Sequence, residues 1–129
     1  MKTVYLCGGI NGLGDAECKS WRAEATDALR GCFAVKDPMR RDFRGHESQL
    51  GPFIVEADLR DISNSDVLLV NASRPSWGTA MEVYAAHTAR KCVVTFGAPS
   101  NPSPWLAQHS HAMFADLAAA LAFITAHCS

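Results

Sequence analysis

Two carboxylates lie in helix-like segments at positions where an acid could do chemistry, and Glu82 is the first. It shares a predicted helical face with Ala85, Ala86 and Ala89, whose small side chains let that face pack closely against a neighbour. A helix predicted to begin at residues 78–79 places Glu82 in its first turn. The helix dipole there favours an anion and lowers its pKa, which suits a nucleophile that must stay ionised. The alternative is that Glu82 merely complements the dipole.

Asp58 is the second acid. In a helix predicted to open at Pro52, Ile54, Asp58 and Ile62 are spaced by four, so Asp58 lies in the stripe that faces the core or a cleft. A carboxylate is costly there unless it is hydrogen-bonded or has a function. Local pairing with Arg60 or with a backbone amide is the structural alternative. Asp61 lies at the edge of the stripe and is expected at the surface or beside a sugar.

A glycine-rich loop follows the first predicted strand. Gly8, Gly9, Gly12 and Gly14 provide backbone that can cradle a phosphate or let a sugar approach closely. The spacing G-G-x-x-G-x-G matches neither the dinucleotide fingerprint nor a P-loop, and no G-K-(S/T) follows it. The loop alone is a weak signal.

The elements that must position these residues alternate between strand and helix. Strands are predicted at residues 3–7, 32–35, 66–70 and 92–96, helices at 15–29, 52–62, 78–90 and 116–127, and loops at 36–51 and 97–104. This order predicts one α/β domain over residues 1–129. The expected architecture is doubly wound, Rossmann-like or flavodoxin-like, with about five mainly parallel strands flanked by helices and ligands held beyond their carboxyl ends.

The composition narrows the class of partner. Hydrophobic residues make up 48% of the 129 residues and the formal net charge is −1, which favours a packed domain and argues against a nucleic-acid polymer as partner. No stretch reaches the length of a membrane span, and the segment MKTVYLC is too short for a signal peptide. We therefore expect a cytoplasmic protein that does not bind membranes.

Cysteine and histidine give little support for a metal or cofactor. The five cysteines are widely separated and form no C-x-x-C pair, so those in strand-like runs, Cys7, Cys32 and Cys92, are expected to act as small hydrophobic residues. The histidines, among them His87, His109 and His111, are expected to lie in separate environments. We predict no metal site and no cofactor.

Three sequence blocks together resemble the nucleoside 2-deoxyribosyltransferase superfamily, which includes nucleoside 5′-monophosphate N-glycosidases. YLCGGI at residues 5–10 is similar to the strand ending Y-x-x-G-x-I. Residues 58–66 are similar to the block D-L-x-x-I-x-x-(S/A)-D, and residues 78–86 resemble the signature G-(T/S)-x-x-E-x-G-x-A. One departure is the pair Val83-Tyr84, which stands where many members have a small residue after the glutamate.

The resemblance implies that the chain cleaves an N-glycosidic bond. Glu82 would be the nucleophile that forms a ribosyl ester, Asp58 would assist at the base or ribose, and Tyr5 would help to place the nucleophile or the sugar. Capture of the ester by another base makes such an enzyme a transferase, whereas capture by water makes it a hydrolase. The preferred base, the sugar and the choice of acceptor stay open.

The same resemblance implies where substrate and partner bind. Ser76 resembles a phosphate-binding serine of the monophosphate glycosidases, and Trp77 or Phe43 can stack on a base. Family members are commonly homodimers or larger assemblies with shared active sites, so Asn101 and Ser103 in the proline-rich loop are candidates to reach a neighbour's ligand. The predicted substrate-binding residues are Gly8, Gly9, Ile10, Asn11, Asp61, Ser76, Trp77, Gly78, Asn101 and Ser103.

Two other functions remain open on the sequence. A nucleotide-binding or sensor domain of the same fold could have lost turnover, although binding alone needs no buried nucleophile. A glycohydrolase that cleaves NAD would also use a glutamate against an anomeric carbon. Arg40, Arg41 and Arg44 could bind the anion of a nucleotide, or could simply be solvated.

Overall fold

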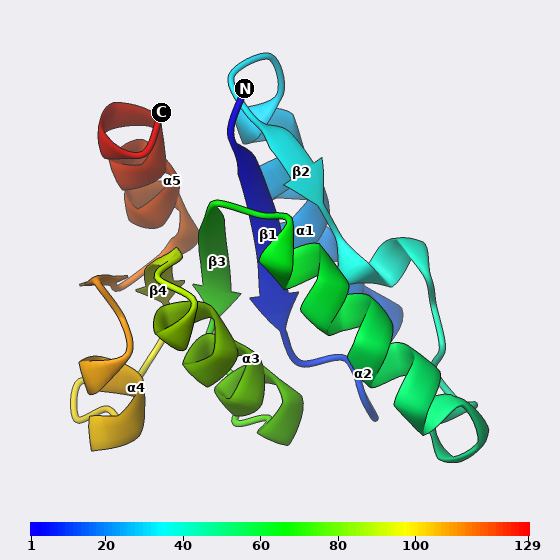
Figure 1. Cartoon of the computed structure of the whole chain (residues 1–129). Helices are drawn as coiled ribbons and strands as arrows, with labels where there is room; N and C mark the ends of the chain where they lie inside the picture. Colours follow the sequence, from blue (N-terminus) through cyan, green and yellow to red (C-terminus); the bar gives the residue numbers. More distant parts are fainter.

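The protein folds into a five-stranded parallel sheet between two layers of helices, as a computed structural model describing residues 1–129 shows (Figure 1). The strands are β1 (Thr3–Gly8), β2 (Ala34–Lys36), β3 (Val67–Asn71), β4 (Cys92–Phe96) and β5 (Ala112–Phe114). Their order in the sheet is β2-β1-β3-β4-β5, and every neighbouring pair is parallel. The predicted doubly wound α/β fold is therefore confirmed.

Two apolar clusters fill the two sides of the sheet. The helices α1 (Asp15–Leu29) and α5 (Leu117–His127) cover one side, where Val4 and Leu6 of β1 lie in the larger cluster. The helices α2 (Glu47–Ser63) and α3 (Trp77–Thr88) cover the other side, where Tyr5 and Cys7 belong to the second cluster. Because successive strand residues point to opposite faces, Tyr5 and Cys7 face α2 and α3 together.

The strand order reverses between β1 and β3, because the chain runs from β1 outward to β2 and then returns to β3 on the other side. Loops at the carboxyl ends of these two strands lead into α1 and α3 respectively. In open parallel sheets this switch point is where ligands bind. The glycine loop and the start of α3 therefore lie at the place where the topology favours a site.

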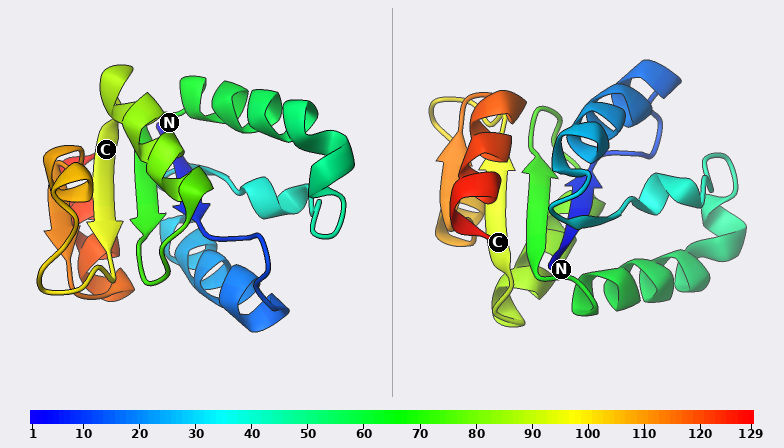
Figure 2. Two further views of the ribbon diagram at one scale, coloured as in Figure 1. Left: turned by 90° about the horizontal axis from the view of Figure 1, so that it is seen from below. Right: turned by 90° about the horizontal axis from the view of Figure 1, so that it is seen from above.

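The helix α2 differs from its prediction. It begins at Glu47 rather than at Pro52, which lies inside it, and the preceding segment contains a 3₁₀ turn at Pro38–Arg40. The carbonyl of His46 accepts bonds from the amides of Gln49 and Leu50, so a helical turn forms ahead of the proline. In Figure 2 the first turns of α2 extend away from the sheet. Prediction of a loop over residues 36–51 was therefore wrong at both ends.

Smaller differences affect the other elements. β2 is shifted from the predicted 32–35, and α3 begins one residue earlier than expected. The strand β5 and the short helix α4 (Pro104–Gln108) were not predicted, because three and five residues are too few to show a period. No helix is long and apolar enough to cross a membrane.

Candidate active site

Two side chains of β1 donate hydrogen bonds to the carboxyl group of Glu82. The phenol of Tyr5 donates a hydrogen bond to Oε2 of Glu82 across 2.7 Å, and the thiol of Cys7 donates to Oε1 across 3.3 Å. Tyr5 and Cys7 are both fully buried. Two strand residues on one face thus hold the two oxygens of one carboxyl group.

The environment of Glu82 corrects the predicted direction of its pKa. α3 begins at Trp77, so Glu82 is in the second turn and loses most of the benefit of the helix N-terminus. Burial raises the pKa of Glu82 to about 7, against hydrogen bonds from Tyr5 and Cys7 that lower it, while the charge of Asp58 raises it further. At neutral pH the carboxyl is therefore divided between its acid and its anion, rather than held ionised as the sequence predicted.

Asp58 lies close enough to Glu82 and Tyr5 for its charge to raise the pKa of each. It is half-buried on α2, in agreement with its predicted place in the inward stripe, and Nη2 of Arg41 lies 3.4 Å from its Oδ1. Burial raises the pKa of Asp58, and the charge and hydrogen bond of Arg41 act in the opposite direction. The alternative of a local pair with Arg60 does not form, because Arg60 pairs with Glu56 instead.

Asp61 is buried, contrary to its expected place at the surface. Its side chain is only 8% exposed and accepts hydrogen bonds from Arg40 and Arg41 at 2.7–2.9 Å, with Lys36 at 3.8 Å. Burial acts to raise the pKa of Asp61, but the two arginines outweigh it and lower the pKa. Asp61 therefore anchors the segment before α2, and its oxygens are already occupied within the chain.

The segment that contains Arg40, Arg41 and Arg44 packs against the rest of the protein through ion pairs. Arg40 and Arg41 bind Asp61, and Arg44 binds Asp42 at 2.7 Å and Asp15 at 2.6 Å. None of these three is simply solvated, and each has at least one acidic partner. The Nε atom of Arg41 is buried without a hydrogen-bond partner, which leaves one unused donor near Asp58.

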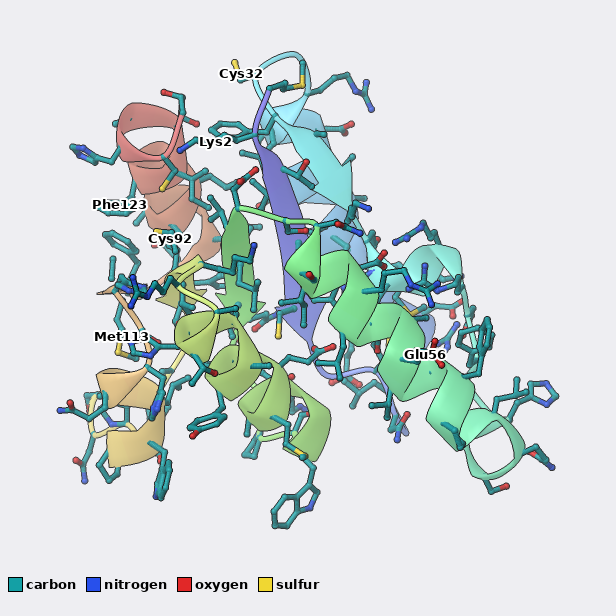
Figure 3. The ribbon with its side chains drawn as sticks, in the orientation of Figure 1. Lys2, Cys32, Glu56, Cys92, Met113 and Phe123 are labelled. Carbon is teal, nitrogen blue, oxygen red and sulfur yellow. The ribbon has the colours of Figure 1, made fainter.

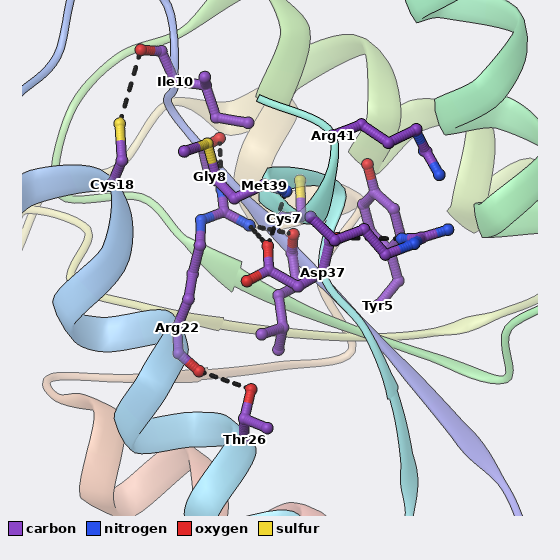
Figure 4. Close-up of polar contacts among 12 residues, drawn as sticks. Tyr5, Cys7, Gly8, Ile10, Cys18, Arg22, Thr26, Asp37, Met39 and Arg41 are labelled. Atoms are coloured by element: carbon purple, nitrogen blue, oxygen red, sulfur yellow. Dashed lines mark hydrogen bonds and ion pairs between the residues drawn. The ribbon is translucent and has the colours of Figure 1, made fainter. Parts of the chain in front are cut away.

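Arg22 is a site residue that the sequence analysis missed. It is 1% exposed, and it reaches from α1 to the carbonyl oxygens of Leu6 at 2.7 Å and Gly8 at 3.1 Å and to Asp37 at 3.0 Å (Figure 4). Its charge acts to lower the pKa of Glu82, Cys7 and Asp58. Nothing in a single sequence separates this arginine from those on an exposed helix face.

The glycine loop comes close to the start of α3, as the candidate substrate residues require. A Cβ added to Gly9 would lie 3.8 Å from Cβ of Ser76, and one added to Gly8 would collide with Trp21 at 2.9 Å. Ile10 is partly buried and Asn11 is exposed in the same loop. A cavity of about 270 Å³ lies between this loop, α1 and the end of β3, lined in part by Gly9, Ser73 and Arg74. A more open hollow of about 400 Å³ lies beside α1 and is lined in part by Asp27 and Asp37, not by Glu82 or Asp58.

Ser76 caps the N-terminus of α3. Its Oγ accepts a hydrogen bond from the amide of Thr79 at 3.3 Å, which leaves the hydroxyl hydrogen free to donate. The neighbouring Trp77 is 91% exposed and Gly78 is exposed. Asn101 and Ser103 are also exposed in the loop after β4, where Ser103 caps α4 by accepting from the amide of Trp105 at 3.2 Å. Within one chain the Trp77 side chain is therefore almost entirely open to solvent.

Three histidines lie together, contrary to expectation. The ring centroid of His87 is 4.9 Å from that of His109 and 5.1 Å from that of His111. α3, α4 and β5 bring these rings together, and β5 and α4 are the elements that the sequence did not reveal. No group of three or more histidine, cysteine or acidic side chains is arranged to hold a metal ion.

Comparison with solved structures places the fold beside 2-deoxyribosyltransferases. A 2-deoxyribosyltransferase from Leishmania mexicana aligns with a TM-score of 0.74 at 17% identity, over 98% of this chain and 99% of that one. The enzyme from Bacillus psychrosaccharolyticus aligns with a TM-score of 0.71 at 21% identity, over 88% of this chain and 86% of that one. A conserved protein from Enterococcus faecalis aligns with a TM-score of 0.63 at 16% identity, over 98% of this chain and 87% of that one.

No protein-family model matches the sequence, and no curated protein matches it. At these identities the structural likeness defines the fold, which is that of the 2-deoxyribosyltransferases, over nearly the whole chain.

Proposed function

We propose that this protein belongs to the nucleoside 2-deoxyribosyltransferase superfamily and cleaves the N-glycosidic bond of a (2′-deoxy)nucleoside or its 5′-monophosphate. The observation that carries the proposal is the 2.7 Å hydrogen bond from Tyr5 to Glu82, with Asp58 beside them at the ligand-binding end of the sheet. Burying a glutamate beside a second acid lowers the stability of the fold, and such strongly perturbed carboxyl groups are typical of catalytic sites. The shared fold supports the same assignment.

In the proposed first step, an ionised oxygen of Glu82 attacks the anomeric carbon. The carbon–oxygen bond forms as the bond from that carbon to the base nitrogen breaks, and the bonding electron pair leaves with the base. We assign protonation of the departing base to Asp58, which lies beside Glu82; burial raises the pKa of Asp58, and the charge and hydrogen bond of Arg41 act in the opposite direction. In the second step another base, or water, attacks the same carbon as the ester bond breaks. The bonding electron pair returns to Glu82 as its carboxylate, and the incoming nucleophile gives a proton back to Asp58.

Tyr5 orients Glu82 and stays neutral. Burial, followed by the negative charge of Glu82, raises the pKa of Tyr5, so the phenol is a hydrogen-bond donor throughout the physiological range. A neutral donor stabilises the carboxylate without forming a full ion pair. Glu82 thereby keeps nucleophilic character, and a measurable fraction of it is ionised at neutral pH.

The 5′ side of the substrate is assigned to the glycine loop and Ser76. A Cβ built on Gly9 would lie 3.8 Å from that of Ser76, so the glycine loop comes close to the free hydroxyl hydrogen of Ser76 at the N-terminus of α3, where an anion is favoured. This arrangement supports a 5′-monophosphate as substrate. Asp61 is not part of it, because its oxygens are bound by Arg40 and Arg41.

We also propose that the protein self-associates. Trp77, Met81 and Tyr84 are spaced by four and three on α3 and are 91%, 71% and 52% exposed, so they form an apolar stripe beside the site. Trp105 on α4 extends this stripe through its stacked contact with His109, which in turn packs on Tyr84. A second copy seated here would shield the aromatic side chains and bring its own Asn101 and Ser103 near a ligand.

Measurement of base release from a defined panel tests the function. Nucleosides and 5′-monophosphates of each base are incubated with the protein, with and without a second free base, and products are separated by chromatography. Release that disappears in Glu82→Ala supports the proposal, and appearance of a new nucleoside shows transfer. NAD is included in the panel, because nicotinamide release alone would point to the NAD-cleaving alternative. Ligand binding without any base release would favour a sensor domain.

A further inference from the structure

Cys7 is the second buried side chain that contacts the carboxyl group of Glu82. Its Sγ lies 3.3 Å from Oε1, on the opposite side of the carboxyl group from Tyr5, which holds Oε2. The thiol is fully buried and separated from Tyr5 by one residue along β1. The sequence suggested only that Cys7 fills space in the core.

We propose that Cys7 is a positioning residue for Glu82, and that its thiol and the Tyr5 phenol together fix the plane and direction of the Glu82 carboxyl group. The effect on turnover rests on the proposed function. The effect on the carboxyl group itself does not, because it concerns contacts within the folded chain.

Two donors are needed because of the way a glutamate side chain rotates. The last torsion of glutamate joins a tetrahedral carbon to a planar carboxyl group and has a broad energy profile. A single hydrogen bond to Oε2 leaves the other oxygen free to swing about that contact. A second donor on Oε1 defines the plane, so that the same lone pair faces the substrate in each turnover.

A thiol suits this position because it is a weak donor that stays protonated. Burial, followed by the charge of Glu82, raises the pKa of Cys7 well above its usual value, so the sulfur keeps its hydrogen and does not compete as a nucleophile. A weak hydrogen bond withdraws little electron density from the oxygen. Glu82 is therefore oriented at a small cost to its reactivity.

The thiol also has a second acceptor within reach. The carbonyl oxygen of Thr79, one turn before Glu82 on α3, lies 4.0 Å from Sγ of Cys7. When Oε1 loses its negative charge in the glycosyl ester, the S–H group can turn toward this carbonyl rather than remain unpaired in the core. Such an exchange needs only a rotation about the Cβ–Sγ bond of Cys7.

The test compares Cys7→Ala, which removes the donor, with Cys7→Ser, which restores a donor of another element. Cys128→Ala serves as the matched control: Cys128 is also a buried thiol, but its Sγ faces that of Cys92 at 3.9 Å. In Figure 3 Cys92 lies next to Phe123 of α5, on the other side of the sheet from α3. The ionisation of Glu82 is followed by carbon NMR of glutamate labelled at the carboxyl carbon, with Glu82→Gln to assign its signal.

Loss of the Cys7 donor should raise the pKa of Glu82 above about 7, by half a unit or more, because the bond from Cys7 lowers that pKa in the native protein. Cys7→Ser should bring the pKa back to or below the native value, and Cys128→Ala should leave it unchanged. In turnover, Cys7→Ala should lower kcat about tenfold with little change in KM, and the acid limb of the pH profile should move upward with the pKa.

An unchanged Glu82 titration in Cys7→Ala would overturn the proposal. So would a shift that Cys7→Ser does not reverse, or an equal shift in Cys128→Ala, since either would indicate a general packing effect. If the predicted titration shifts occur in a protein that releases no base from any substrate, the positioning role stands and the proposed function fails.

Discussion

Tyr5 and Glu82 are 77 residues apart in the chain, yet the phenol of one lies 2.7 Å from the carboxyl of the other. The contact forms because β1 lies next to β3 in the sheet and α3, which follows β3, packs over the face of β1 that carries Tyr5. The hydrogen bond from Tyr5 lowers the pKa of Glu82, whereas burial raises it. Removal of the Tyr5 hydroxyl should therefore raise the pKa of Glu82.

Tyr5→Phe should raise the pKa of Glu82 above about 7 and lower kcat/KM by about 10- to 100-fold, as expected for a lost hydrogen bond to a charged group. The acid limb of the pH profile of kcat/KM should move to higher pH, since that limb reports ionisation of Glu82 in the free enzyme. A profile that keeps its acid limb while activity falls would separate Tyr5 from this ionisation.

Glu82 should also make the stability of the fold depend on pH. Its folded-state pKa of about 7 exceeds the ordinary value of 4.5, so the folded protein binds this proton more tightly between those pH values. The free energy of unfolding should therefore fall as pH rises from about 4.5 to about 7, by about 3 kcal/mol from this group. Below pH 4.5 this contribution is fully present.

The glutamine of Glu82→Gln carries no charge at any pH, so this substitution should abolish the fall in the free energy of unfolding between pH 4.5 and about 7. We expect its Tm to exceed that of the native protein at pH 8, and the difference to shrink toward pH 5, as measured by differential scanning calorimetry. Glu56→Gln is the matched control, because Glu56 is on the exposed side of α2 with a side chain 73% exposed (Figure 3). Equal effects of the two substitutions at both pH values would contradict the burial argument.

Ser76→Ala should weaken binding of 5′-monophosphates and spare nucleosides. The substitution removes the hydroxyl that we assign to phosphate and also the cap on the Thr79 amide, which costs about 1 kcal/mol of stability. Ser76→Asp keeps a cap but adds a negative charge, so it should reject monophosphates more strongly than alanine does. KM values for paired nucleosides and monophosphates measure this, and a parallel change for both substrate classes would argue against a phosphate contact.

Self-association should depend on the apolar stripe of α3. Trp77→Ser and Met81→Ser together should shift the protein toward monomer in sedimentation velocity, because these side chains are 91% and 71% exposed in a single chain. Phe53→Ser tests whether exposed apolar side chains of α2, where Phe53 is 56% exposed, also contribute to self-association. A native protein that is monomeric at all concentrations and fully active would refute the shared-site proposal.

The fold followed from sequence where runs were long and regular. The buried strand at residues 66–70 and the helix ending at Leu29 were placed within one or two residues, because apolar periodicity specifies such elements locally. The start of α2 was misplaced, because proline is common at the first position of a helix, which is where the sequence predicts Pro52. The turns before Pro52 have no local sequence signal, and a tertiary contact, Phe43 against Phe53, lies beside them.

The fold brings the three acidic and phenolic candidates of the sequence together, but their electrostatics were not predicted. Glu82, Tyr5 and Asp58 were identified from their spacing and the resemblance, and the fold brings them together. Three features depend on contacts between distant segments and leave no local pattern in one sequence. They are the pairing of buried Asp61 with arginines, the hydrogen bonds from Arg22 to the carbonyls of β1, and the raised pKa of Glu82.

The role of Glu82 as nucleophile is tested most directly by mass spectrometry of the protein after reaction with a 2′-fluoro nucleoside or its 5′-monophosphate, because the fluorine slows breakdown of a glycosyl ester. We expect one added sugar per chain, mapped by peptide sequencing to Glu82, with no adduct in Glu82→Gln. Unreduced base release by Glu82→Ala, or an adduct on another residue, would contradict the claim that Glu82 is the nucleophile.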